Sequence, residues 1–188
     1  RGLGDVYKRQ VFLFSIFWIA LLSCNDISSS SKQITMADDL QQEFTKGTFG
    51  YDLNFLKKYH KDLVLLEEEG TGAKVIVLPA YQGRVMTSSA QGNEGISFGW
   101  VNHEFIAAEK AVEHFNVFGG EERFWMGPEG GQFSIYFKKG VEFKFDNWYV
   151  PKEIDTEPFN MVSSSKSAVS FEKEMHLENY SGNKFDLK

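Results

Sequence analysis

The sequence predicts a mainly β fold that contains one short N-terminal helix. Three observations lead to this prediction. Apolar and polar residues alternate with a period of two in several segments, mostly in the second half of the chain. Turns that contain glycine separate many of these segments, and only the stretch 51–60 shows helical spacing in the folded part. The chain has 188 residues, of which 42% are hydrophobic and 24% charged, which is ordinary for a globular domain with a tail.

The first 24 residues are expected to lie outside the folded domain. Residues 1–10 begin with Arg1 instead of methionine, and we interpret them either as an artefactual segment or as the basic n-region of a signal peptide. Residues 11–24, VFLFSIFWIALLSC, contain an apolar run that is too short to span a membrane. Such a run is typical of a signal-peptide helix. It ends at Cys24 in a pattern that resembles the bacterial lipobox.

Cys24 is the only cysteine in the chain, and its lipidation would anchor the protein to a membrane of the bacterial cell envelope. The alternative is an unmodified cysteine buried in an N-terminal helix. A single cysteine excludes an internal disulfide and a cysteine-based zinc site. Residues 25–46 contain four consecutive serines and few apolar residues, so we expect a polar tether between the anchor and the domain.

Residues 47–188 form the predicted domain. The spacing of Leu53, Leu56 and Tyr59 predicts a helix over 51–60, with His60 as a surface residue at its end. Strands are predicted at 63–66, at 74–78 and after Gly83, with a glycine turn at 70–72 between the first two.

Two hairpins are predicted in the second half. The clearer one covers 131–150, where phenylalanines and other apolar residues alternate with polar ones on both sides of Lys139-Gly140. The other runs from 168 to 188, with Phe171, Met175 and Leu177 facing inward, His176 outward, and a turn at 181–183. Because Lys188 falls inside the last alternating segment, we interpret the chain as truncated at its C-terminus.

Charge and motifs exclude several classes of protein. The net charge is −6 and no basic stripe follows residue 10, which argues against a nucleic-acid partner. The sequence contains no nucleotide-binding loop, zinc-protease helix, nucleophile elbow or EF-hand, so neither a cofactor nor a metal is expected. The Ser-x-x-Lys match at Ser163 and Lys166 lacks the partner motifs that would give it meaning.

One segment combines the residue types of a binding surface. The stretch VFGGEERFWMGPEGGQFSIYF, Val117–Phe137, places Arg123, Trp125 and Glu129 between two Gly-Gly pairs. An indole face, a fork of guanidinium donors and a carboxylate suit the faces and hydroxyls of a sugar. We therefore expect these three residues to bind a carbohydrate ligand. The alternative is that Trp125 belongs to the core and Arg123 pairs with one of its glutamate neighbours, at 121, 122 or 129.

FGGEERFWMGPEGGQFSIYF, together with GRVMTSS and GISFGWVNHEFI upstream, resembles an uncharacterised lipoprotein family of the galactose mutarotase-like (aldose 1-epimerase-like) superfamily. The similarity covers about Thr48–Lys188. It implies a partial antiparallel β-supersandwich, the N-terminal part of a longer domain, whose open face binds carbohydrate.

Mutarotases of this superfamily use a histidine general acid and a glutamate general base on opposite sides of the sugar ring. His114 and His103 are the candidates for the acid, and each is otherwise a surface histidine. The family's base lies beyond Lys188, so this fragment is expected to be inactive. Three functions stay open at this point: an epimerase-like enzyme in its full-length form, a non-catalytic glycan-binding lipoprotein, and a surface module that binds a protein.

Overall fold

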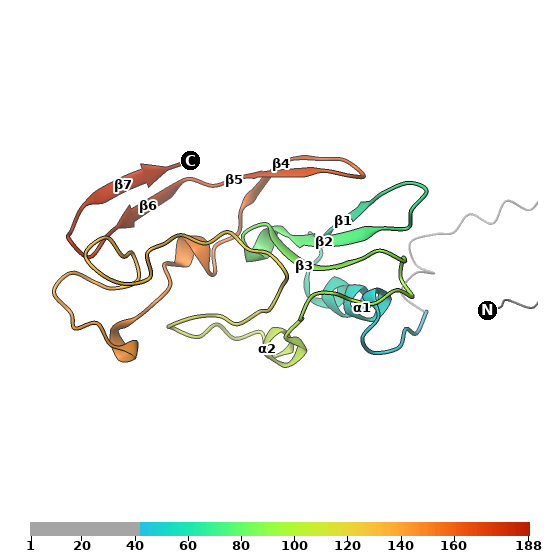
Figure 1. The fold of residues 1–188 in the computed structure, drawn as a ribbon, viewed down its shortest axis with the longest axis horizontal. Coiled ribbons are helices and arrows are strands. Elements are labelled where there is room, and N and C mark those ends of the chain that lie inside the picture. The colour runs from blue at the N-terminus through green and yellow to red at the C-terminus, as the bar shows by residue number, and fades with distance from the viewer. Residues whose placement is uncertain (1–41) are drawn as a thin grey trace, which may run out of the picture. The chain divides into compact units, whose positions relative to one another are not determined.

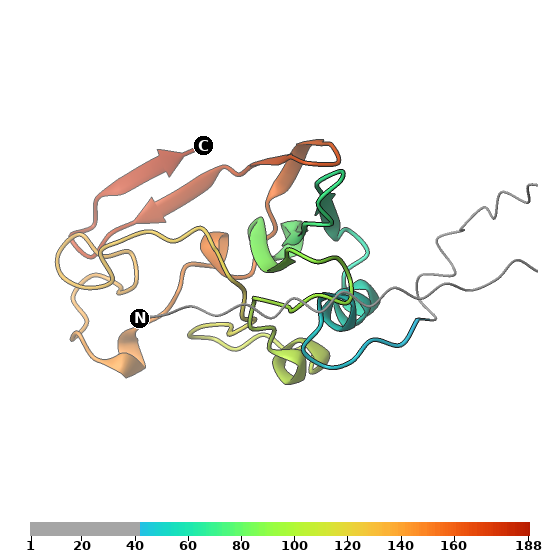
Figure 2. The same cartoon turned by 45° about the vertical axis from the view of Figure 1, so that its right-hand side comes forward.

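The computed structural model describes residues 42–188. The predicted signal peptide, the lipidation at Cys24 and most of the predicted tether therefore lie outside the described residues. The fold is mainly β, as predicted: in the described part, seven strands form three small antiparallel sheets, with two short α-helices and three 3-10 turns (Figures 1 and 2). No helix in this part of the chain has the length and apolar character needed to cross a bilayer.

The first sheet and its helix confirm the elements predicted for 51–89. Helix α1, Phe49–Tyr59, begins two residues before its predicted start. Strands β1 (Val64–Glu67), β2 (Lys74–Leu78) and β3 (Arg84–Ser89) pair in the order β1-β2-β3. These predictions succeeded because hydrophobic spacing and glycine turns are both local signals.

A first hydrophobic core lies between this sheet and α1 (Figure 1). Leu56 of α1, Ile76 and Leu78 of β2 and Met86 of β3 are all fully buried in it. A second short helix, α2 (His103–Ala107), adds Ile106 to the same core.

The hairpin predicted for 131–150 is wrong. The chain from 111 to 144 contains no regular element, and the only ladder contact in the predicted hairpin is an isolated bridge between Phe137 and Trp148. Ile135, Tyr136 and Phe137 are all buried although they are consecutive, so the segment lacks the solvent-facing side that the predicted hairpin required. Phe133, expected to face inward, is exposed. Packing of successive residues overrides the alternation seen in the sequence.

The C-terminal strands form two separate two-stranded sheets. β4 (Asn160–Ser164) pairs with β5 (Val169–Glu172), and β6 (Met175–Glu178) pairs with β7 (Lys184–Leu187). The turn predicted at 181–183 is present. Met175 and Leu177 are buried as predicted, and Phe171 is half-buried. No strand was predicted at β4, because its residues do not alternate between apolar and polar; all five are exposed in the structure.

A second hydrophobic core contains side chains of the irregular segment and of strand β6. It contains Ile135–Phe137, Val150, Ile154, Met175 and Leu177. The 3-10 turn η1 (Pro79–Tyr81) follows β2 and ends at its C-cap, Gln82. Two hydrogen bonds connect this turn and its cap to the segment that precedes β4. The Phe159 amide donates to the Pro79 carbonyl at 3.0 Å, and Gln82 Nε2 donates to the Glu157 carbonyl at 3.0 Å.

Candidate functional site

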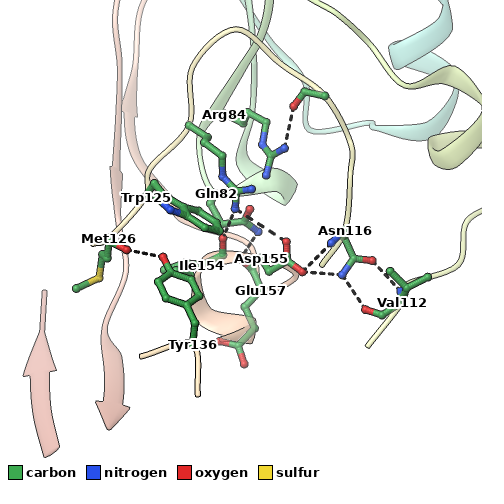
Figure 3. Close-up of polar contacts among 12 residues, drawn as sticks. Gln82, Arg84, Val112, Asn116, Trp125, Met126, Tyr136, Ile154, Asp155 and Glu157 are labelled. Carbon is green, nitrogen blue, oxygen red and sulfur yellow. Dashed lines mark hydrogen bonds and ion pairs between the residues drawn. The ribbon is translucent and has the colours of Figure 1, made fainter. Parts of the chain in front are cut away.

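Figure 3 shows a cluster of buried polar side chains. It lies between the N-terminal part of the domain, which contains the first hydrophobic core, and the C-terminal part, which contains the second. Asp155 and Asn116 are only 2% and 1% exposed. Asn116 donates to Asp155 Oδ2 twice, from its side chain at 2.6 Å and from its backbone amide at 3.2 Å. The Asn116 side chain also exchanges two hydrogen bonds with the backbone of Val112. These bonds fix the loop 112–116 against the 3-10 turn η3, Lys152–Ile154, which precedes Asp155.

Arg123 belongs to this cluster, but its acidic partner differs from those predicted. Its Nη2 donates to the Ile154 carbonyl at 2.7 Å and lies 3.9 Å from Asp155 Oδ1. The structure places Asp155, rather than a glutamate close in sequence, beside the guanidinium. Burial is the main influence on both groups: it lowers the pKa of Arg123 and raises the pKa of Asp155, each partly offset by the other's charge.

Arg84 is a second buried guanidinium, at 2% exposure. Its Nη1 donates to the Gly119 carbonyl at 2.8 Å, and its guanidinium carbon lies 5.6 Å from the centre of the Phe118 ring. Burial, with Arg123 as the next cause, lowers the pKa of Arg84 to about 10. Arg123 is therefore the guanidinium that lies beside the buried carboxylate, while the Arg84 guanidinium bonds to a backbone carbonyl.

The first Gly-Gly pair exists because the backbone passes very close to its neighbours. Gly119 and Gly120 have φ angles of 88° and 115°, which L side chains rarely adopt. A Cβ on Gly120 would lie 2.8 Å from Arg84 Cδ, and one on Gly119 would lie 2.1 Å from the Trp100 carbonyl oxygen. The pair therefore allows a close backbone approach, and the approaching groups belong to the protein itself.

The structure brings Arg123, Trp125 and Glu129 together. The Arg123 guanidinium carbon lies 4.3 Å from the centre of the half-buried Trp125 ring, and Trp125 Nε1 donates to Glu129 Oε1 at 2.8 Å. Tyr136 stacks on the same indole at 5.1 Å with 27° between the planes (Figure 3). Trp125 thus contacts Arg123 and Tyr136 through its ring and hydrogen-bonds Glu129 through its N–H. Protein groups therefore already occupy much of the indole face.

The stack continues beyond Tyr136 through further aromatic rings. Tyr136 and Trp148 are 5.7 Å apart with 12° between their planes, and Trp148 and Phe145 are 6.3 Å apart at 15°. Phe145 in turn stacks with His114 at 5.7 Å and 22°. A continuous series of nearly parallel groups therefore connects Arg123 to His114.

The far end of this stack lines a groove of about 720 Å³. Three separate segments form it: 113–114, 135–153 and 176–178. Its lining combines the aromatic residues Trp148 and Tyr149 and His114 with four carboxylates (Glu113, Asp146, Glu153, Glu178) and two lysines (Lys138, Lys152). This groove was not predicted, because 131–150 was expected to form a hairpin. The run DNWYVPKE, with aromatic residues beside charged ones, could have indicated it.

His114 is held in one tautomer within the groove. Its Nδ1 lies within hydrogen-bonding distance of the Trp148 carbonyl oxygen, and a carbonyl can only accept. The proton of the neutral ring therefore lies on Nδ1, and Nε2 carries a lone pair that can accept a proton. This geometry leaves His114 able to take part in proton transfer.

His103, the other predicted candidate, lies in a different environment. Its Nε2 is 2.8 Å from Asp52 Oδ1, at ion-pair distance but outside hydrogen-bonding alignment. Its ring packs against Phe55 at 4.4 Å. Asp52 is buried and also accepts a hydrogen bond from Ser97. His103 thus connects α2 to α1 and is not among the residues that line the groove.

The two remaining histidines test two smaller expectations. His176 projects outward from β6, as predicted, and its hydrogen bond to Asp186 at 2.6 Å raises its pKa. His60 is not the surface residue that was predicted. It is half-buried, because its ring packs edge-on against Tyr81 and its Nε2 lies 2.9 Å from the tyrosine oxygen.

These features define a β domain in which an aromatic stack connects a buried charge cluster to an open groove. The model of a protein family of unknown function, DUF6786, matches residues 47–188. Because the match covers most of the chain, the protein belongs to this family. No curated protein and no solved structure matches the chain.

Replacement of Asp155 by alanine is expected to destabilise the domain strongly. It would leave the Arg123 guanidinium and the buried Asn116 amide without their carboxylate, and breaking such a group costs about 3–5 kcal/mol. Urea denaturation measures the loss, with Glu174→Ala, an exposed carboxylate, as the control that should change stability by less than about 0.5 kcal/mol. Similar losses in the two variants would contradict a special role for Asp155.

Glu157 gives a prediction on pH. Its carboxylate accepts hydrogen bonds from Lys173 at 2.6 Å and Lys152 at 3.0 Å, which lower its pKa. These pairs therefore stabilise the fold above the ordinary glutamate pKa of about 4.3 and lose their effect as the pH falls through the lower, folded value. We expect Glu157→Gln to cost up to about 1 kcal/mol near neutral pH, since the pairs are partly exposed.

The same urea titrations repeated at decreasing pH measure this effect. The difference between the wild type and Glu157→Gln should shrink steadily below about pH 4. A difference that does not depend on pH would show that the substitution acts through packing instead of charge.

Proposed function

We propose that this protein is a cell-envelope lipoprotein, anchored through Cys24, whose β domain binds carbohydrate in the groove beside His114. The observation that carries the proposal is the aromatic stack that ends in this groove. Rings fixed by stacking present a flat apolar surface without losing further freedom when a ligand binds. The antiparallel sheets are compatible with the partial β-supersandwich that the sequence resemblance implies, and we propose that architecture for the family.

The groove offers both kinds of contact that sugars need. Trp148 and Tyr149 supply apolar faces for the C–H side of a sugar ring. Carboxylates such as Asp146 and Glu153 can accept hydrogen bonds from hydroxyl groups, and Lys138 can donate them. A volume of about 720 Å³ lies within the range of small-molecule sites.

In this proposal Arg123 and Trp125 act mainly as positioning residues. They do not line the groove themselves. Tyr136 stacks on both Trp125 and Trp148, and Trp148 lines the groove. Glu129 is exposed, so its carboxylate is also open to a ligand that extends beyond the groove.

A second candidate function is aldose-epimerase-like catalysis by the full-length protein, and the tautomer of His114 favours it. Such a reaction needs an acid that protonates the ring oxygen and a base that removes the proton of the anomeric hydroxyl. The ring then opens and recloses with the other configuration. His114 and several carboxylates line one groove, which is the set of groups that this chemistry requires.

Trp148→Ala tests the binding proposal. Loss of its ring face is expected to weaken oligosaccharide binding about tenfold or more in isothermal titration calorimetry. Trp100→Ala is the matched control, because Trp100 is exposed and is not among the groove's lining residues. Unchanged affinity in Trp148→Ala, with circular dichroism showing an intact fold, would remove the groove as the sugar site.

His114→Gln tests the catalytic candidate. Exchange between the anomers of a common aldose, followed by polarimetry with the full-length protein, should slow by at least about 100-fold if His114 is the general acid or base. Binding measured by calorimetry should change far less. If the wild-type protein does not accelerate anomer exchange of any aldose tested, the catalytic candidate is wrong and only the binding proposal stands.

A further inference from the structure

A second, smaller pocket lies at the ends of α1 and α2 and shares no lining residue with the groove. Its volume is about 260 Å³, roughly a third of that of the groove. The residues that matter for its chemistry are Tyr59, His60, Tyr81, Phe105, Glu109 and Phe118.

A hydrogen-bonded pair of neutral groups forms one side of this pocket. His60 Nε2 lies 2.9 Å from the Tyr81 hydroxyl oxygen, and Tyr81 is buried. Burial lowers the pKa of His60 and raises that of Tyr81, so both side chains are uncharged near neutral pH. Their mutual hydrogen bond uses one donor and one acceptor, so the pair keeps one donor and one acceptor for a ligand, which matches a hydroxyl group better than it matches an ion.

Aromatic rings form the adjoining walls. Tyr81 and Phe118 are stacked with 3.7 Å between their ring centres and 14° between their planes. Phe105 meets Phe118 edge-on at 5.4 Å. These contacts hold the rings in place, and the faces that they leave exposed suit the apolar side of a small saturated ring.

Glu109 contributes a carboxylate at the edge of the pocket despite an unfavourable backbone conformation. It follows Ala108, the C-cap of α2, and has a φ of 49°. At this position after a helix the left-handed conformation usually selects glycine, so a glutamate is retained at a cost in stability. Strain of this kind is concentrated at functional sites. Glu109 and Tyr81 line the same pocket, and the charge of Glu109 contributes, after burial, to the raised pKa of Tyr81.

From the size of the pocket, its neutral hydrogen-bonding pair, its aromatic walls and the retained glutamate, we propose that it binds a single neutral monosaccharide unit. His60 and Tyr81 would bind a hydroxyl group, Glu109 would accept a hydrogen bond from a further hydroxyl, and the ring of Phe105 would contact the C–H side of the sugar. The protein would then have two carbohydrate sites, a groove for a longer chain and a pocket for one ring. The pocket is argued from its own residues, so it stands even if the groove has another role.

The chain's own histidines report on both sites in one experiment. Of its four histidines, His60 lines the pocket, His114 and His176 line the groove, and His103 lines neither. Side-chain resonances of histidine-labelled protein would be followed by NMR during titration with glucose, galactose and mannose. We expect saturable shifts of His60 with at least one of these sugars, while the His103 signals stay in place.

Tyr81→Phe removes the hydroxyl but keeps the ring that stacks on Phe118. It should weaken binding reported by His60 about tenfold, the equivalent of one hydrogen bond, and leave the His114 response unchanged. Tyr149→Phe, in the groove, is the matched control and should leave the His60 titration unaltered. Saturation of His114 without any shift of His60 would overturn the pocket while supporting the groove.

Glu109→Gly provides a variant that is expected to fold at least as well as the wild type, because glycine suits the left-handed position. We expect a higher melting temperature together with weaker sugar binding at His60. If Glu109→Gly binds sugar as tightly as the wild type, Glu109 does not contact the ligand. A titration in which neither His60 nor His114 responds to any sugar would count against both carbohydrate sites.

Discussion

The arrangement of the whole domain depends on the need to neutralise and bond a few charges that lie away from water. Asp155 sits between Asn116 and the guanidinium of Arg123, while Arg84 arrives from β3. These residues come from both halves of the domain, and each half contains its own hydrophobic core. Apolar contacts tolerate sliding, whereas a buried carboxylate with directed hydrogen bonds has few alternatives. The cluster therefore fixes how the two cores meet.

This constraint explains how a long irregular segment can present a defined surface. Residues 111–144 contain no regular element, so no ladder of backbone hydrogen bonds orders them. Asn116 and Arg123 attach the first part of the segment to the charge cluster, and the ring stack from Trp125 through Tyr136 to Trp148 carries that order to the groove. Both proposed sites lie next to this segment, and Phe118 within it forms a wall of the smaller pocket.

Local patterns predicted the N-terminal half of the fold well and the middle poorly. Helix α1 and strands β1 to β3 follow from hydrophobic spacing and glycine turns, because both are signals that neighbouring residues carry. The hairpin at 131–150 failed because Ile135, Tyr136 and Phe137 are buried in succession, in contacts made by distant parts of the chain. In the site, the association of Arg123 with Trp125 could be predicted from their proximity in sequence. The partnership of Arg123 with Asp155 depends on folding and could not.

The Gly119-Gly120 pair has a consequence for how relatives of this protein can vary. Both positions combine a left-handed backbone with a neighbour that any Cβ would strike, so no other amino acid fits without moving the chain. A saturation library at these two positions should return almost only the original codons after selection for folded protein. In an alignment such a pair would be invariant for a reason that concerns backbone shape alone, and its invariance should not be read as a signature of ligand contact.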